Sequence, residues 1–135
     1  MLSIGALSKR TGVKIPTIRY YEQVGLLPEP ERSESNQRRY GGGGVDRLGF
    51  IRHARDLGFS IQAIRELIYL SEHPDLPCID ATRIAAEQLI AVRARIAKLK
   101  RLEAELDQIA SDCTARSAAD CYVLKALSEH APREN

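Results

Sequence analysis

The sequence predicts a mostly α-helical protein: an N-terminal winged helix-turn-helix domain followed by a long antiparallel coiled-coil dimerisation helix. Over residues 1–71, short apolar helical patterns alternate with glycine and proline turn signals. From about residue 82 to residue 111 the chain contains no Gly or Pro, and apolar residues recur at three- and four-residue steps. A chain of 135 residues fits one small domain plus such an extended element.

Two short helices open the chain. Ser3 can cap a first helix through its hydroxyl oxygen, and the Thr11-Gly12 pair ends it. Pro16 then lies in the first turn of a second helix, where its missing N–H does no harm, and this helix stops near Gly25. Two short helices joined by a tight glycine-containing turn form a helix-turn-helix pattern.

Residues 26–40 predict a small wing, because the prolines at 28 and 30 exclude a helix and a polar tip suggests a turn between two extended arms. Residues 45–55 then predict a third helix, which Gly58 ends. The glycines at 41–44 are poor helix formers and put the start of this helix in question. Ser60 caps a fourth helix, whose apolar stripe comprises Ile61, Ile64, Leu67 and Ile68.

The long helix predicts a second chain. Its apolar seam comprises Leu89, Val92, Ile96, Leu99, Leu102, Leu106 and Ile109. Roughly thirty helical residues span about 45 Å, more than the small N-terminal domain can cover. A two-helix coiled coil therefore buries the seam best, and the alternative is a helix packed on its own domain.

We accordingly divide the chain into four parts. Residues 1–71 form the winged helix-turn-helix domain, and residues 72–81 form a linker that carries Cys78. Residues 82–111 form the dimerisation helix. Residues 112–130 form a cysteine-containing loop and a short C-terminal helix, and the residues after His130 are expected to be disordered.

Charge distribution favours a polyanionic partner for the front of the chain. Residues 1–60 carry ten Lys/Arg against six Asp/Glu, although the whole chain has a net charge of only +2. No apolar run is long enough to cross a membrane, and the N-terminus shows no signal peptide. We therefore expect a cytoplasmic protein without a membrane partner.

Specific motifs resemble the MerR family of winged-helix regulators. The residues at 17–22 read TIRYYE, followed by GLL at 25–27, and Asn36, Arg38 and Tyr40 fall in the wing. VDRL at 45–48 and LGFS at 57–60 continue the resemblance, which extends through the long helix and the cysteine pattern. The run of glycines at 41–44 departs from the family, whose members usually have a polar stretch there.

Physical reasoning and the resemblance agree on double-stranded DNA as a partner. The second helix would enter the major groove, where Arg19 can bind a guanine edge or a phosphate. The remaining candidate contacts, from this helix, the wing and the third helix, are Lys14, Thr17, Tyr20, Arg38, Tyr40, Arg52 and Arg55. Tyr21 is expected in the core. For Arg47, Arg52 and Arg55, a solvated helix face is as good an interpretation as a phosphate contact.

Three cysteines predict a metal site shared between two chains. Cys78 and Cys113 flank the long helix and are on the order of 50 Å apart along it, so they cannot meet within one chain. Antiparallel pairing would bring Cys78 of one protomer to Cys113 and Cys121 of the other. The alternative is three buried structural cysteines.

Three thiolates are soft ligands that suit Hg(II), Pb(II) or Cd(II), whereas Zn(II) would need a fourth donor such as Asp112, Asp120 or His73. By resemblance, Cys78 separates this chain from members that sense Cu(I) or Ag(I), which carry Ser there. Zinc-sensing relatives often carry an extra Cys and His in the loop, so we rank Cd, Pb and Hg above Zn.

The resemblance further implies a homodimer on a palindromic operator that distorts promoter DNA on binding metal so that RNA polymerase can engage. Alternatives are a Cu(I)/Ag(I)-type sensor and a redox or organic-ligand sensor of the same family. An enzyme is not expected, because no catalytic dyad, phosphate loop or nucleophile elbow is present.

Overall fold

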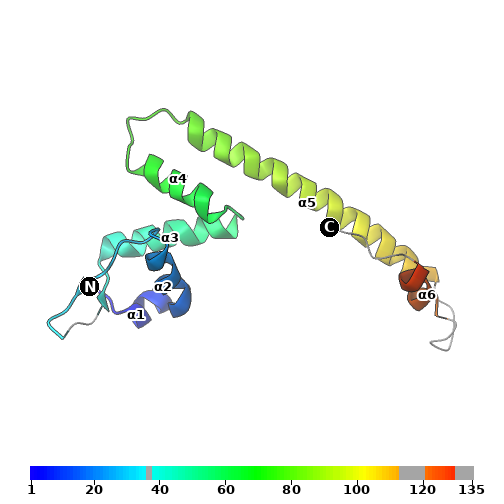
Figure 1. Ribbon diagram of the computed structural model, residues 1–135, viewed down its shortest axis with the longest axis horizontal. Helices are drawn as coiled ribbons and strands as arrows, with labels where there is room; N and C mark the ends of the chain where they lie inside the picture. The colour runs from blue at the N-terminus through cyan, green and yellow to red at the C-terminus, as the bar shows by residue number, and fades with distance from the viewer. Residues whose placement is uncertain (36–37, 113–120, 130–135) are drawn as a thin grey trace. The chain divides into compact units, whose positions relative to one another are not determined.

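The computed structural model describes residues 1–35, 38–112 and 121–129, but not the side chains of residues 38 and 112. Its elements are α1 (Ile4–Thr11), α2 (Ile15–Gln23), β1 (Glu31–Arg32), β2 (Arg38–Arg39), α3 (Gly42–Asp56), α4 (Ile61–Ser71), α5 (Ile79–Asp112) and α6 (Tyr122–Glu129) (Figure 1). They form two compact units, Met1–Gln88 and Leu89–Asn135. The predicted mostly helical fold, with a helix-turn-helix domain and a long C-terminal helix, is confirmed. Antiparallel pairing of that helix stays a prediction.

Local caps set the bounds of the first two helices. The Ser3 side chain accepts a hydrogen bond from the Ala6 amide at 3.2 Å, which satisfies a free donor of the first turn. Gly12 ends α1 in the left-handed conformation, with φ 75°. Pro16 lies in the first turn of α2, as predicted.

The wing consists of the antiparallel strands β1 and β2, with Glu31 opposite Arg39 and Arg32 opposite Arg38. Tyr40 follows β2 and pairs with Leu2 through two backbone hydrogen bonds of 2.7 Å each. These bonds fix the base of the wing to the start of the chain.

Helix α3 begins at Gly42, three residues before the start expected at Val45. The Gly44 and Val45 amides both donate to the Gly41 carbonyl, at 3.1 and 3.2 Å, so the glycines form the first turn. Fully buried Leu48 and Ile51 anchor the rest of α3 in the core, and this packing outweighs the poor helix propensity of the glycines.

The core of the first unit joins all four of its short helices and the base of the wing. Its buried residues are Leu7, Val13, Ile18, Tyr21, Leu26, Leu27, Tyr40, Leu48, Ile51, Ala54, Ile64 and Ile68. Ser60 caps α4 by accepting from the Ala63 amide at 3.0 Å, which directs Ile64 and Ile68 into this core.

Helix α5 has 34 residues and begins at Ile79, slightly earlier than the sequence pattern indicates. Most of its predicted seam is exposed: Leu89, Ile96, Leu99, Leu102 and Leu106. In the second unit, Ile109 of α5 and Ala126 of α6 are buried. The expected disorder after His130 falls outside the described residues. No helix in the described ranges combines the length and apolar character that a membrane span needs.

Candidate DNA interface and thiol site

Helix α2 has one face in the core and one in solvent. Ile18 is fully buried and Tyr21 is 7% exposed, so Tyr21 belongs to the core as predicted. Arg19 is exposed and Tyr20 is 47% exposed. The neighbouring rings of Tyr20 and Tyr21 lie 6.0 Å apart between centroids. Buried Ile18 and Tyr21 therefore hold α2 in the core. Arg19 and Tyr20 remain accessible to a ligand.

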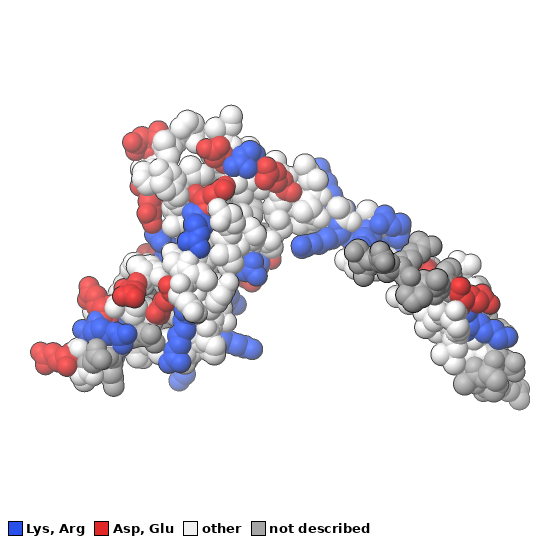
Figure 2. All heavy atoms as spheres, in the orientation of Figure 1, with Lys and Arg blue, Asp and Glu red and all other residues white. Residues whose placement is uncertain are grey.

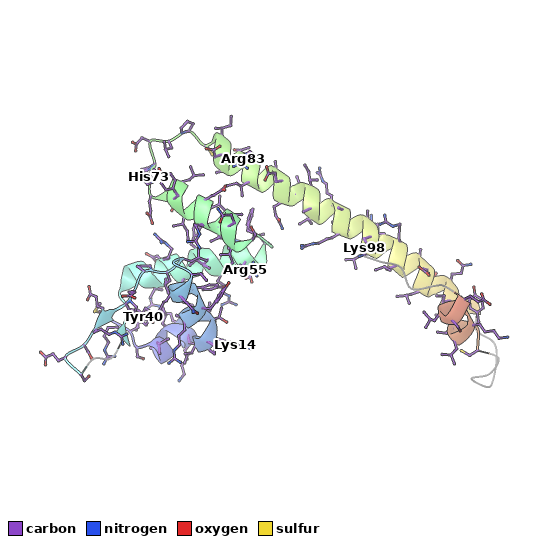
Figure 3. The ribbon with its side chains drawn as sticks, viewed as in Figure 1. Lys14, Tyr40, Arg55, His73, Arg83 and Lys98 are labelled. Atoms are coloured by element: carbon purple, nitrogen blue, oxygen red, sulfur yellow. The ribbon has the colours of Figure 1, made fainter. Side chains whose placement is uncertain are left out.

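The start of α2 adds two polar candidates. Lys14 occupies the N-cap position with an exposed side chain, and its carbonyl accepts from the Thr17 amide at 3.0 Å. Thr17 is half-buried. Figure 3 labels Lys14 at this end of the domain, beside α1. A cation and helix amides near one another suit a phosphate group.

The wing residues have different environments. Arg38 begins β2, and its side chain lies outside the described part of the chain. Tyr40 is only 3% exposed, and its hydroxyl donates to the Glu22 carboxylate of α2. In this structure Tyr40 therefore joins the base of the wing to the second helix; a direct contact with DNA stays a prediction.

The arginines of α3 are bound to backbone carbonyls. Arg52 donates to the Thr11 carbonyl at the end of α1 and lies 3.9 Å from the Asp56 carboxylate. Arg55 donates to the Phe59 carbonyl at 2.8 Å. Both side chains are exposed, so the same guanidiniums have faces open to solvent.

Two further arginines hold the C-terminal end of α2. Arg65 of α4 donates to the Val24 carbonyl at 2.7 Å, and Arg47 of α3 donates to the Leu26 carbonyl at 3.4 Å. Sequence reasoning did not identify these contacts. The only local signal is that helix ends leave carbonyls without partners, and no sequence pattern shows which distant arginine will reach them.

The surface charge of the first unit is uneven. Figure 2 shows Lys and Arg side chains around the end formed by α1 and α2, whereas Asp and Glu gather over α4 and the loop that follows it. The exposed cations at the first end include Lys9, Arg10, Lys14 and Arg19. This end is therefore the part of the unit suited to a polyanion.

Cys78 lies exposed at the start of α5, where its carbonyl accepts from the Thr82 amide at 3.0 Å. The Thr82 hydroxyl donates to the same carbonyl at 3.1 Å and lies 3.8 Å from the Cys78 sulfur. The preceding loop is held by His73, whose Nδ1 lies 2.7 Å from the Tyr69 carbonyl.

Arg83 joins the first turns of α5 to α4. It lies 3.1 Å from Glu87, 3.5 Å from Glu66 and 3.9 Å from Asp80. A hydrogen bond to Glu87, together with the charges of the three carboxylates, raises the pKa of Arg83 above its usual value. Figure 3 labels His73 in the loop between α4 and α5, and Arg83 near the start of α5.

Cys121 is half-buried at the start of α6, and its carbonyl accepts from the Lys125 amide at 3.1 Å. Cys78 is a free thiol. Cys113 lies outside the described residues, directly after the last residue of α5. Within the described ranges, no three His, Cys, Asp or Glu side chains come together as a metal site.

A small helical domain with a helix-turn-helix, a wing and a cationic end defines a winged-helix DNA-binding protein. Two family models match the chain: "MerR HTH family regulatory protein" over residues 2–70 and "MerR, DNA binding" over residues 45–109. The chain therefore belongs to the MerR family of helix-turn-helix transcription regulators and is not an enzyme.

Three relatives are similar over nearly their whole length. The Heavy metal-dependent transcription regulator 2 of Rhizobium meliloti is 34% identical, covering 99% of this chain and 91% of the relative. The Mercuric resistance operon regulatory protein of Serratia marcescens is 37% identical, covering 98% and 92%. The crystal structure of PbrR691 from Ralstonia metallidurans CH34 in complex with lead(II) superposes with a TM-score of 0.79 at 37% identity, covering 94% of this chain and 99% of that one.

Proposed function

We propose that this protein is a heavy-metal-responsive transcription regulator that acts as a homodimer on a palindromic promoter operator. The observation that carries the proposal is the placement of the cysteines: Cys78 is exposed immediately before α5, and Cys113 follows it immediately. The names of the relatives, which refer to heavy metals, mercuric resistance and lead(II), support a metal as the signal.

The DNA-binding part rests on α2 and its surroundings. Arg19 and Tyr20 would reach base edges or phosphates, with Lys14 and Thr17 at the start of the same helix and Arg38 in the wing. Arg52 and Arg55 would add phosphate contacts through the faces that their carbonyl hydrogen bonds leave open. One domain offers few contacts, so a dimer with two half-sites is needed for a specific operator.

The dimer part rests on the exposed seam of α5. Leu99 and Leu106 are 63% and 65% exposed, although both lie in the predicted apolar seam. Burying these side chains against a second copy of α5 removes apolar surface from water. An antiparallel arrangement pairs the start of one helix with the end of the other, about 50 Å away along a helix of 34 residues.

The donor set fits a thiophilic metal ion. In the antiparallel dimer, Cys78 of one protomer would meet Cys113 and Cys121 of the partner subunit at each end of the coiled coil. The exposed thiol of Cys78 is available for this role. Three thiolates favour Cd(II), Pb(II) or Hg(II) over Zn(II), which prefers a fourth ligand. One ion bound at each end would join the two protomers there.

We further propose that metal binding makes the dimer distort the operator. RNA polymerase would then engage a promoter whose undistorted geometry does not suit it. The two DNA-binding domains would move relative to each other when the ends of the α5 pair are cross-linked. Part of the free energy of metal binding would offset the cost of bending or untwisting the DNA between the half-sites.

Mixing two inactive variants tests the shared site. Neither Cys78→Ser nor Cys113→Ser/Cys121→Ser can form a complete three-thiolate site as a homodimer. In a heterodimer one end regains all three thiols and the other end has none. We expect thiolate-to-metal charge-transfer absorbance at half the sites of the heterodimers, after the mixture has been unfolded and refolded with Cd(II) or Pb(II).

Differently tagged chains, purified through both tags, confirm that heterodimers have formed. Absence of charge-transfer absorbance in such heterodimers would contradict the antiparallel trans site. A parallel titration of the reduced wild-type protein with Cu(I), Zn(II), Cd(II), Pb(II) and Hg(II) ranks the metals. Preference for Cu(I) would contradict the divalent assignment.

A further inference from the structure

The C-terminal end of α2 is held by side chains from two other helices. Arg65 of α4 donates to the Val24 carbonyl at 2.7 Å, and Arg47 of α3 donates to the Leu26 carbonyl at 3.4 Å. Both carbonyls belong to the turn that ends the DNA-recognition helix. A displacement of either arginine would therefore change the support of that helix.

Arg47 has a second partner, which lies at the end of α4. Its Nη2 atom donates to the carboxylate of Glu72, the C-cap residue of α4. Its Nη1 atom donates to the Leu26 carbonyl. The Arg47 side chain is 25% exposed and that of Glu72 is 51% exposed. One half-buried arginine thus joins the end of α2 to the end of α4.

The connection from Glu72 to Cys78 is short and constrained. Residues 73–77 separate the two, and prolines at 74 and 77 restrict the backbone. His73 stacks on Tyr69 with ring centroids 4.1 Å apart, and the Leu76 amide donates to the His73 carbonyl at 3.0 Å. The connection between Cys78 and Glu72 is therefore short, and its prolines and internal contacts restrict its conformations.

We propose that Arg47 is a positioning residue that couples the Cys78 segment to the recognition helix, with Glu72 as the contact through which it responds. The inference rests on the proposed function, because Cys78 must be a metal ligand for the coupling to matter. When the Cys78 segment moves, Glu72 moves with it. The hydrogen bond from Arg47 to the Leu26 carbonyl, just after α2, then changes.

The other link between α4 and the start of α5 is less suited to this role. Arg83 contacts Glu66 of α4 at 3.5 Å, but it also contacts Glu87 at 3.1 Å and Asp80 at 3.9 Å within α5. Loss of one of three carboxylates leaves Arg83 paired. For Arg47, the described residues provide one carboxylate, and the same guanidinium reaches the end of α2 directly.

The test separates metal binding, operator binding and the response that links them. The variant is Glu72→Ala, and the matched control is Glu87→Ala, which removes a carboxylate from an ion pair within α5. Cd(II) and Pb(II) affinity is read from charge-transfer absorbance. Affinity for an operator duplex, selected from random sequences, is read from fluorescence anisotropy. Distortion is read from 2-aminopurine at the centre of that duplex.

We expect Glu72→Ala to keep metal and metal-free operator affinities within about twofold of wild type and to reduce the metal-induced 2-aminopurine change at least fivefold. Glu87→Ala should respond like wild type. Glu72→Gln, which keeps a hydrogen-bond acceptor for Arg47 without its charge, should give an intermediate response. A purely structural contact would instead alter thermal stability or basal operator affinity and leave the metal response unchanged.

A full metal response in Glu72→Ala would overturn the inference, as would a loss of operator affinity in the absence of metal. If the wild-type protein itself binds neither Cd(II) nor Pb(II), the proposed function fails along with the inference. The absorbance titration of wild type distinguishes that outcome from a failure of the coupling alone.

Discussion

The glycines that open α3 allow a sharp test of the fold. Gly42 and Gly43 lie in the first turn of the helix, and neither is among the glycines with positive φ. Apart from the adjacent residues and the backbone of the helix itself, a Cβ atom added at either position would meet no heavy atom within 4 Å. The double variant Gly42→Ala/Gly43→Ala should therefore stabilise the protein, because alanine loses less conformational freedom on folding than glycine.

The expected gain in the free energy of unfolding follows from the conformational entropy that each glycine loses on folding. Each substitution at a compatible backbone position should add about 0.4–1 kcal/mol to the free energy of unfolding, so the pair should add about 1–2 kcal/mol. For a domain of this size, each kcal/mol raises the melting temperature by about 4–8 °C. The increase should appear in urea as a higher midpoint with an unchanged slope.

Gly12→Ala is the matched control of opposite sign. Gly12 has φ 75°, and a Cβ atom there would collide with the guanidinium of Arg52. The left-handed conformation alone costs a non-glycine residue about 1–2 kcal/mol. Urea unfolding of the full chain at one fixed protein concentration compares all variants, since dimerisation would make stability concentration-dependent. An unchanged or lower midpoint for the double alanine variant would refute a helical start at Gly42.

Three further substitutions test the proposed function and the packing. Arg19→Ala should weaken operator binding in a gel-shift assay by at least tenfold while the dimer persists, because a good base contact contributes roughly 1–3 kcal/mol and occurs twice per dimer; unchanged affinity excludes this role. Leu99→Glu should give monomers in sedimentation equilibrium, because it puts a charge into the seam. Lys98→Glu, which changes a charged residue beside the seam, should leave the protein dimeric. If both variants remain dimeric, the interface lies elsewhere. Tyr40→Phe should lower the free energy of unfolding by ~1 kcal/mol through loss of the hydrogen bond to Glu22, and a urea midpoint equal to that of wild type would show that this bond contributes nothing.

The elements that follow local rules were predictable from the sequence. Ser3 and Ser60 cap their helices through hydrogen bonds to residues three positions away, and Gly12 ends α1 in the conformation that glycine favours. The apolar seam of α5 repeats along a stretch without Gly or Pro. The capping partners are near neighbours in the chain, and the seam is recognised from the spacing of its own residues, so local sequence contains the required information.

The start of α3 and the roles of several arginines depended on tertiary structure. Propensity argued against a helix through the glycines, but the burial of Leu48 and Ile51 stabilises α3 as a whole. Arg52 reaches the Thr11 carbonyl and Arg65 reaches the Val24 carbonyl, each across 41 positions of sequence. Charged residues on a helix face look alike in sequence, and only the folded chain shows which of them meet an unpaired carbonyl. The sequence thus determined where most helices, the seam and the thiols lie, because these depend on local residues, while tertiary packing decided where α3 begins and which side chains hold the end of α2.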